Sequence, residues 1–240
     1  MAQALVPLKD LVAAKSRLSG VLNPSERRAL AQAMVEDVLA VLSEHPQVDG
    51  VTLVSDDPGA ELLAAKYNVD CWDDRSLGCS GLSAVIARSC DMLLQNTEAP
   101  LLVLHGDLPL LGRDDISAML ACVKQNGGLV IGCDGVGQGS NFMAFDAAGV
   151  PDFSYGRGSC YRHLQSVRRR GQSARVIRRR GIALDVDSPQ DLALLLTQLE
   201  AGAKSQTADL LVDTELGRRI GRLLESLQPQ PQNLNIGKVQ

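Results

Sequence analysis

Short apolar runs alternate along the chain with longer segments in which apolar residues recur at helical spacing. The apolar runs predict strands over residues 4–8, 48–55, 69–72, 100–105, 129–133, 141–145 and 174–177. The longer segments predict helices over residues 23–45, 57–67, 81–95, 114–125, 159–170 and from 188 onward. Because the two alternate and the strands are apolar on both faces, we predict an α/β fold: one Rossmann-like domain with a mostly parallel central sheet flanked by helices.

Local sequence signals mark the starts of two helices and one interruption of this alternation. Asn23-Pro24-Ser25-Glu26 combines an N-cap, a proline at the first helical position and a capping glutamate, and Ser188-Pro189 caps a later helix. The rhythm breaks over residues 135–159, where two glycine-rich loops surround one predicted strand. We therefore expect the substrate pocket in this region.

The composition changes at about residue 202. Residues 207–227 have helical apolar spacing, and the Gln/Pro-rich stretch 228–232 is typical of disorder. We predict one domain over residues 1–201, followed by a helix and a disordered tail over 202–240. The helix either docks on the domain or mediates self-association as a homodimer, and both alternatives stay open.

Composition excludes several classes. Of the 240 residues 45% are hydrophobic, yet no apolar run is long enough to cross a bilayer, so no membrane association is expected. The start of the chain has no features of a secretion signal or transit peptide, which predicts a cytoplasmic protein. Six scattered cysteines lack metal-ligand spacing and favour reduced core thiols. Aromatic residues are only 3%, which disfavours nucleic acid as a partner.

The charge is unevenly distributed. The formal net charge is −4, yet residues 157–180 contain nine arginines and no acid. One interpretation is a polyanionic ligand near this segment. The alternative is structural: residues 168–170 end a helix, where cations suit the dipole, and residues 178–180 form a solvated strand end.

Three aspartates are candidates for metal binding. Asp107 follows the apolar run 101–104, at the edge of the sheet where α/β proteins bind ligands. Asp185 and Asp187 are two residues apart in an extended segment, so both carboxylates should face one side. Together with phosphate oxygens, the three acids would suffice for Mg²⁺. The alternative is that Asp185 and Asp187 belong to a turn and cap before the next helix.

Two kinds of loop are candidates for phosphate binding. The loop after the first strand carries Lys9, Lys15 and Arg17, but it has neither a dinucleotide fingerprint nor a Walker motif. The glycine-rich stretches 137–141 and 156–159 allow close backbone approach, and the second opens a helix whose free N–H groups favour an anion. No nucleophile–base pair is recognisable around the three histidines.

Taken together, these motifs resemble the phospholactate guanylyltransferase family. The stretches that carry the resemblance are Val6-Pro7-Leu8-Lys9, Lys15-Ser16-Arg17-Leu18, Val54-Ser55-Asp56-Asp57-Pro58, Gly106-Asp107-Leu108-Pro109, Gly139-Ser140-Asn141 and Leu184-Asp185-Val186-Asp187. The resemblance spans about residues 4–200 and implies a glycosyltransferase-A-like fold. It also implies the joining of GTP to 2-phospho-L-lactate, phosphoenolpyruvate or 3-phospho-D-glycerate, with release of pyrophosphate, in coenzyme F420 biosynthesis.

The resemblance also implies site residues. Asp107, Asp185 and Asp187 look like the Mg²⁺ ligands and, with Lys15 and Arg17, like the catalytic set. The positions that look like the nucleotide site are Pro7, Leu8, Lys9, Lys15, Arg17, Ser55, Gly81 and Ser83. The positions that look like the phospho-acid site are Ser140, Asn141, Gly156, Gly158 and Ser159. The sequence departs from the family pattern at His105-Gly106, where Pro-Ala is usual, and at Ser83, where Asn is common.

The predicted chemistry needs no general base. A phosphate monoester has its second pKa at about 6, so it is largely ionised at neutral pH and can attack the α-phosphorus directly. Two other functions stay open: a nucleotidyltransferase that acts on a sugar phosphate or molybdopterin, and a non-catalytic phospholigand or RNA-binding module centred on the arginines. The second would leave the three aspartates without a joint role.

Overall fold

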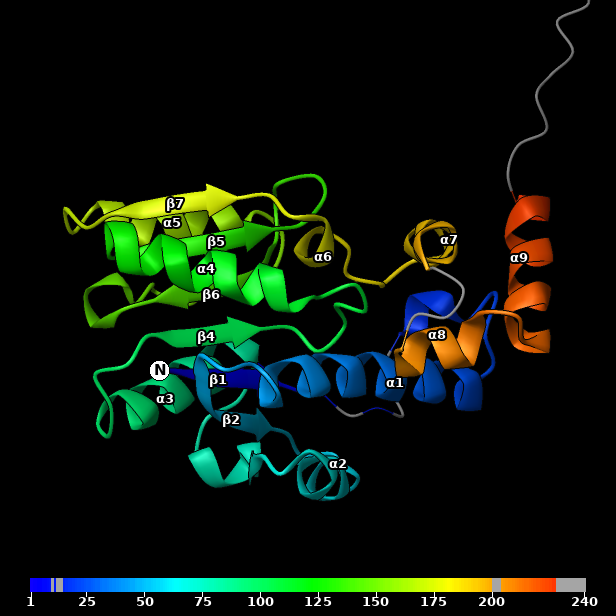
Figure 1. The fold of residues 1–240 in the computed structure, drawn as a ribbon, viewed down its shortest axis with the longest axis horizontal. Coiled ribbons are helices and arrows are strands. Elements are labelled where there is room, and N and C mark those ends of the chain that lie inside the picture. The colour runs from blue at the N-terminus through cyan, green and yellow to red at the C-terminus, as the bar shows by residue number, and fades with distance from the viewer. Residues whose placement is uncertain (10, 12–14, 200–203, 228–240) are drawn as a thin grey trace, which may run out of the picture.

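The computed structural model describes the chain except for residues 10, 12–14, 200–203 and 228–240. Its centre is a seven-stranded sheet (Figure 1). The strands are β1 (Ala2–Pro7), β2 (Val48–Val54), β3 (Asp70–Trp72), β4 (Leu101–Leu104), β5 (Leu129–Cys133), β6 (Ser140–Phe145) and β7 (Ala174–Ile177). Each predicted strand is therefore confirmed to within two residues at either end.

The strands are arranged in the order β3-β2-β1-β4-β6-β5-β7. All neighbouring pairs are parallel except the two that involve β6, which runs antiparallel to both β4 and β5. The predicted mostly parallel sheet is confirmed. The reversal of β6 follows from its short connection to β5, because a parallel neighbour needs a longer crossover.

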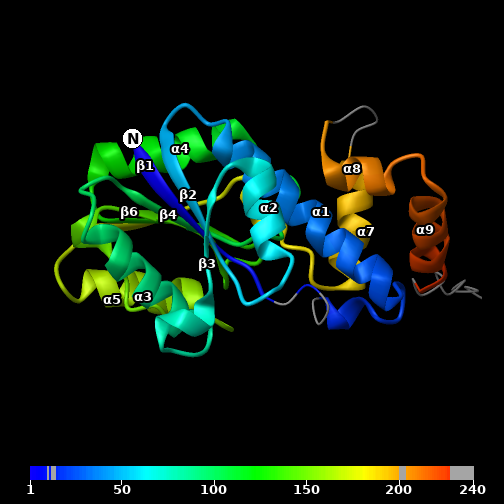
Figure 2. The ribbon, with the colours of Figure 1, turned by 90° about the horizontal axis from the view of Figure 1, so that it is seen from below.

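Helices cover both faces of the sheet (Figure 2). They are α1 (Pro24–Ser43), α2 (Ala60–Tyr67), α3 (Leu82–Leu94), α4 (Arg113–Asn126), α5 (Ser159–Arg168), α6 (Arg180–Ala183), α7 (Pro189–Gln198), α8 (Gln206–Leu211) and α9 (Glu215–Leu227). One core joins α1, α2 and α4 to one face, and a second joins α3 and α5 to the other. Within the described ranges, none of these helices has the length and apolar character needed to span a membrane.

The capping signals act as predicted. The Asn23 side chain accepts the backbone N–H of Glu26, and the Glu26 carboxylate accepts the N–H of Asn23. Ser188 and Asp191 form the same reciprocal box at the start of α7. Each box satisfies free N–H groups of the first turn, so these helices begin where the sequence indicates.

A third core lies beyond the carboxyl edge of the sheet. It joins the first half of α1 to α7, α8 and α9 and contains Leu184 and Val186, which are 6% and 0% exposed. The Asp37 carboxylate on α1 accepts the N–H groups of Gln206 and Thr207 and so caps α8. The C-terminal helices therefore dock on α1, while residues 228–240 lie outside the described residues.

The predicted continuous helix over residues 207–227 is wrong. The structure has two helices, α8 and α9, separated at residues 212–214, where Asp213 has a left-handed backbone with φ +57°. The Thr214 hydroxyl accepts the N–H of Gly217 and starts the second helix. Buried residues of α8 and α9 lie in the same core against α1, which a straight helix of this length would not allow.

Candidate active site

The candidate site lies at the carboxyl ends of β1 and β4. The strand order reverses here, because β1 pairs with β2 on one side and with β4 on the other. Open α/β sheets bind ligands at such a point, since the loops that follow the two strands diverge. The loop after β1 carries Lys9 and Lys15, and the turn after β4 carries Asp107.

Lys15 lies between two of the three predicted metal ligands. Its Nζ is 2.5 Å from Oδ2 of Asp107 and 2.8 Å from Oδ1 of Asp187. Lys15 has a left-handed backbone with φ +56°, which costs a non-glycine residue about 1 kcal/mol or more. The two ion pairs offset this cost. They bring together Lys15, Asp107 and Asp187, which are far apart in the sequence.

The charges at this cluster shift one another. Burial opposes the charge on Lys15, but attraction to Asp107 and Asp187 outweighs it and raises the lysine pKa. Burial likewise opposes the charge on Asp107, but Lys15 and His105 outweigh it and lower the pKa of that carboxyl. The pair is therefore fully ionised at neutral pH.

Asp185 is held differently from the other two acids. The Asn141 Nδ2 donates to Oδ1 of Asp185 at 3.1 Å and to the carbonyl of Ile182 at 3.0 Å. Burial, followed by the charge of Asp107, raises the pKa of Asp185. As predicted, Leu184 and Val186 face the core while the two aspartates do not, but the segment forms no strand, and each aspartate lines a different cavity.

The three acids do not form a closed metal-binding cluster. Among the described residues, no three His, Cys, Asp or Glu side chains lie together closely enough to hold an ion. Two observations nevertheless fit a cation here. The Lys15 ammonium already lies between two carboxylates, and Asp107 Oδ1 is buried with no hydrogen-bond partner in the same described set, 4.0 Å from Nδ1 of His105. Carboxylate oxygens are the ligands that Mg²⁺ prefers.

Three cavities meet around Lys9. One of about 290 Å³ contains Lys15, Asp107 and Asp187, together with Pro7 and Leu8. The other two extend toward α3. Their residues include Gly81 in both, and Ser83 and Gly156 in the larger one of about 450 Å³. Most residues predicted to bind the nucleotide thus line one connected region of the surface.

Two predicted nucleotide-site residues lie elsewhere. Ser55 is 4% exposed, and its hydroxyl accepts the N–H of Asp57, so it shapes the turn after β2. Asp57 in turn accepts the N–H of Leu11, which ties this turn to the loop after β1. Arg17 is exposed on the short 3-10 helix η1 (Ser16–Leu18) and forms no ion pair with another described residue. Their roles in binding stay predictions.

The two glycine-rich loops contact each other. Ser159 Oγ accepts the N–H of Ser140 at 3.1 Å, and Gly156 and Gly158 have positive φ angles that favour glycine. Arg162 donates to the carbonyls of Ser154, Tyr155 and Arg157. The Arg162 guanidinium therefore holds the backbone of this second loop.

Sequence reasoning missed two residues of this wall, Tyr155 and His163. Tyr155 lies between two imidazoles, with ring centroids 5.4 Å from His105 and 5.1 Å from His163. The Ser83 hydroxyl accepts the N–H of Tyr155 and so joins α3 to the second loop. No local motif signals these contacts, because the partners are separated by many residues in sequence.

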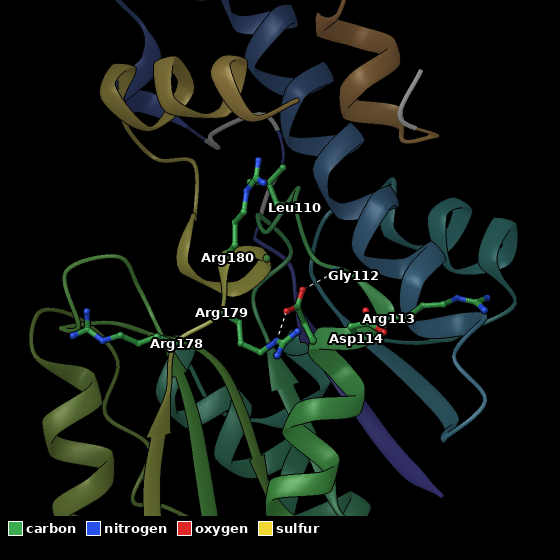
Figure 3. Close-up of a pocket in the computed structure, with 9 residues that line it drawn as sticks. Leu110, Gly112, Arg113, Asp114, Arg178, Arg179 and Arg180 are labelled. Atoms are coloured by element: carbon green, nitrogen blue, oxygen red, sulfur yellow. Dashed lines mark hydrogen bonds and ion pairs between the residues drawn. The ribbon is translucent and has the colours of Figure 1, made fainter. Parts of the chain in front are cut away.

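The arginine-rich segment does not form a converging anion site. An open cavity of about 770 Å³ is lined by Arg113 and the arginines of residues 178–180. Figure 3 shows that Arg113, Arg178 and Arg180 point away from one another, while Arg179 pairs with Asp115 at 2.5 Å. At the end of α5, Arg168 donates to the carbonyl of Ala174, and Arg170 pairs with Asp152. These contacts favour the structural interpretation.

The fold is that of the nucleotidyltransferases and related nucleotide-sugar enzymes. A Desulfovibrio desulfuricans G20 protein described as a nucleotide-diphospho-sugar transferase has a TM-score of 0.77 and 16% identity, over 94% of this chain and 97% of its own. Glucosyl-3-phosphoglycerate synthase from Mycobacterium tuberculosis, solved with Mn²⁺, UDP and phosphoglyceric acid, has a TM-score of 0.54 and 12% identity, over 84% and 80%.

Sequence comparison narrows this class to one family. The model of the family "Guanylyl transferase CofC like" matches residues 2–214, and the chain belongs to that family. Phosphoenolpyruvate guanylyltransferase of Sphaerobacter thermophilus is 34% identical over 84% of this chain and 96% of its own. 3-Phospho-D-glycerate guanylyltransferase of Phenylobacterium zucineum is 33% identical over 89% and 96%. The predicted family and the glycosyltransferase-A-like fold are confirmed, and the protein is a nucleotidyltransferase.

Proposed function

We propose that the protein transfers a guanylyl group from GTP to a three-carbon phospho-acid and releases pyrophosphate, as a step in coenzyme F420 biosynthesis. The observation that carries this function is the Lys15 ammonium held between Asp107 and Asp187 at the switch point of the sheet. Membership of the guanylyltransferase family and the names of the relatives support it.

Mg²⁺ is the cofactor that this set of oxygen donors fits. We assign Asp107, Asp185 and Asp187 as the residues that would hold it. Oδ1 of Asp107, which has no hydrogen-bond partner among the described residues, would be one donor. When bound, the ion would neutralise charge on the phosphate oxygens of the two substrates. Lys15 is close enough to the same carboxylates to take over part of this neutralisation.

The remaining site residues divide between the two substrates. Pro7, Leu8, Lys9, Gly81 and Ser83 line the cavities that we assign to GTP, with Ser55 and Arg17 as outlying members. We assign to the phospho-acid the end of each glycine-rich loop and the first residues of the element that follows it, which are Ser140, Asn141, Gly156, Gly158 and Ser159. Gly156 also lines the cavity of Ser83, so the two sites would meet there.

The reaction then requires positioning and charge neutralisation rather than proton abstraction. The phosphate of the acid, ionised at neutral pH, attacks the α-phosphorus of GTP, and the bond to the pyrophosphate leaving group breaks. Lys9 and Lys15 are the cations next to this cavity that would stabilise the charge on pyrophosphate.

Pyrophosphate release tests the function. Purified protein with Mg²⁺ and GTP should release pyrophosphate with at least one of 2-phospho-L-lactate, phosphoenolpyruvate and 3-phospho-D-glycerate, and much more slowly with ATP or CTP. The three acids differ by a hydroxyl, a double bond or the phosphate position, so a panel is needed to identify the one used. The absence of release with all three acids would show that the proposed function is wrong.

Three further assignments accompany this function. We place the catalytic domain in residues 1–201 and residues 202–240 in a separate C-terminal segment, of which α8 and α9 pack on the domain. We expect the reaction to take place in the cytoplasm, and we expect self-association, if it occurs, to produce a homodimer. Truncation after residue 201 tests the domain boundary. Cell fractionation tests the cytoplasmic location, and light scattering tests the homodimer.

A further inference from the structure

His163 lies between the two loops assigned to the phospho-acid. It is 0% exposed on α5, and both of its ring nitrogens have partners. Nδ1 is 2.9 Å from Oγ of Ser140, and Nε2 is 2.8 Å from the backbone nitrogen of Ser154. One imidazole therefore connects the start of β6 with the loop that precedes α5.

The Ser154 contact fixes the tautomer of this histidine. A backbone N–H can only donate, so Nε2 must accept and carries no proton. In the neutral ring the proton is then on Nδ1, which donates to Oγ of Ser140. Burial, followed by the charges of Arg162 and His105, lowers the pKa of His163 to about 4, which keeps the ring neutral near pH 7.

This tautomer leaves the Ser140 hydroxyl as a donor. Its oxygen already accepts the proton of His163, so its own O–H is free to donate. None of the described residues accepts a hydrogen bond from that O–H, although Ser140 is only 3% exposed. Ser159 resembles it: its Oγ accepts the N–H of Ser140, and the residue is 2% exposed.

A ligand with acceptor oxygens complements this arrangement. Buried hydroxyl protons without acceptors cost free energy, and phosphate or carboxylate oxygens can only accept from them at neutral pH. With the opposite tautomer, Ser140 would donate its proton to Nδ1 and have none left for the ligand. The histidine tautomer thus determines which way the hydroxyl is directed.

We propose that His163 is a positioning residue that directs the Ser140 hydroxyl proton toward an anionic oxygen of the phospho-acid. Its Nε2 at the same time holds Ser154 and, through it, the loop that ends in Gly156. The inference rests on the proposed function, because the ligand is the phospho-acid of that reaction.

The tautomer can be measured without any variant. The chain has only three histidines, so a long-range ¹H–¹⁵N correlation spectrum of the histidine-labelled protein is readily assigned. We expect His163 to be protonated at Nδ1. A second buried histidine, His45, should show the opposite form, because its Nδ1 accepts the N–H of Gln47 and its Nε2 contacts Oγ of Ser117. Protonation of His163 at Nε2 would overturn the proposal.

Kinetic constants test the role of the hydroxyl. S140A and H163F should each raise the KM for the phospho-acid about tenfold or more, the loss expected for a hydrogen bond to a charged group, and change the KM for GTP less than twofold. Because both variants remove the same hydrogen bond, the double variant should be little worse than either. H163N, whose amide can reach Ser140, should recover part of the loss.

H45F is the matched control. His45 is 3% exposed and makes the same two kinds of contact, but it lies just before the amino end of β2. H45F should lower the melting temperature and leave both KM values within about twofold. Multiplicative effects in the double variant, or an equal rise in the KM for GTP in H163F, would contradict the proposal.

Failure of the proposed function gives a different result. If the wild-type protein releases no pyrophosphate with any acid and its His163 resonances do not shift on titration with the acids, the function and this inference both fail. If turnover is normal but S140A and H163F behave like the wild type, only the role of His163 is wrong.

Discussion

Two regions of the molecule bury a carboxylate against a lysine, and they differ in what is left unpaired. On α1, Glu36 accepts hydrogen bonds from Lys66 and Tyr67 of α2 and from Gln32 of its own helix. At the carboxyl edge of the sheet, Asp107 binds Lys15 through Oδ2, while Oδ1 is buried with no hydrogen-bond partner in the described part of the chain and lies 4.0 Å from Nδ1 of His105.

The difference distinguishes a structural carboxylate from a binding one. A buried oxygen without a partner costs free energy, so folding alone favours an arrangement like that of Glu36. At the edge of the sheet, Asp107 retains such an oxygen without a hydrogen bond, and it lies beside a cavity of about 290 Å³. Because a bound cation would satisfy that oxygen, the unpaired valence favours a ligand site over a structural ion pair.

The largest expected effect is on turnover at Asp107. Asp107→Asn keeps the shape of the side chain and removes its charge, so turnover should fall at least about a hundredfold, while the melting temperature changes little. Steady-state pyrophosphate release and thermal unfolding measure the two. Asp49→Asn, at an exposed position of β2, is the control and should change neither. Near-normal turnover in Asp107→Asn would show that Asp107 is not a ligand-binding carboxylate.

Glu36→Ala should show the opposite pattern. It removes the acceptor of three hydrogen bonds at a residue that is 4% exposed, so the free energy of unfolding should fall by about 3 kcal/mol, with unchanged KM values. Denaturant unfolding gives the value. Glu44→Ala, whose carboxylate forms an exposed pair with Arg113, should cost less than about 1 kcal/mol. A changed KM for either substrate would show that the α1–α2 contact is not purely structural.

Acid should destabilise the protein through His163. Its folded pKa of about 4 lies below the ordinary value of 6.5, so the unfolded chain binds the proton more readily. The contribution of neutral His163 to the free energy of unfolding is therefore fully present above about pH 6.5. It decreases by about 2 to 3 kcal/mol as the pH falls toward 4. The charged and titratable groups that face the ring are Arg162 on its own helix and, across from it, His105 and Tyr155.

The pH dependence is isolated by difference. Urea unfolding of the wild type and H163N between pH 4 and 7 should give a shallower slope for the variant, because the other titrating groups are common to both. His45, whose pKa burial also lowers, contributes in the same direction and serves as the comparison in H45F. Identical slopes for the wild type and H163N would contradict the assignment to His163.

The smallest expected effect is at the C-terminal helices. Asp37→Asn leaves one acceptor for the N–H groups of Gln206 and Thr207, so it should cost about 1 kcal/mol. Hydrogen exchange should speed up in α8 and not in α5. Unchanged protection of α8 would mean that packing against α1, rather than the cap, holds these helices.

The sequence by itself determined where strands and helices alternate along the chain and the approximate bounds of the strands. Runs such as 101–104 and 129–133 are apolar on both faces, and this pattern depends only on neighbours along the chain. The helix starts at Asn23 and Ser188 were readable for the same reason, because a capping box is complete within four residues. The position of Asp107 after β4 also followed, since an α/β sheet places strand ends at its ligand-binding edge.

Only the tertiary structure decided which side chains meet. Lys15 reaches acids 92 and 172 residues away, and Ser140 meets a histidine 23 residues on. The break between α8 and α9 lets buried residues of both helices enter one core with α1 and α7. Periodicity records which face of an element is buried, whereas hydrogen-bond partners depend on how the elements are placed in space. The pairing that fixes the tautomer of His163 therefore has no signature in the sequence.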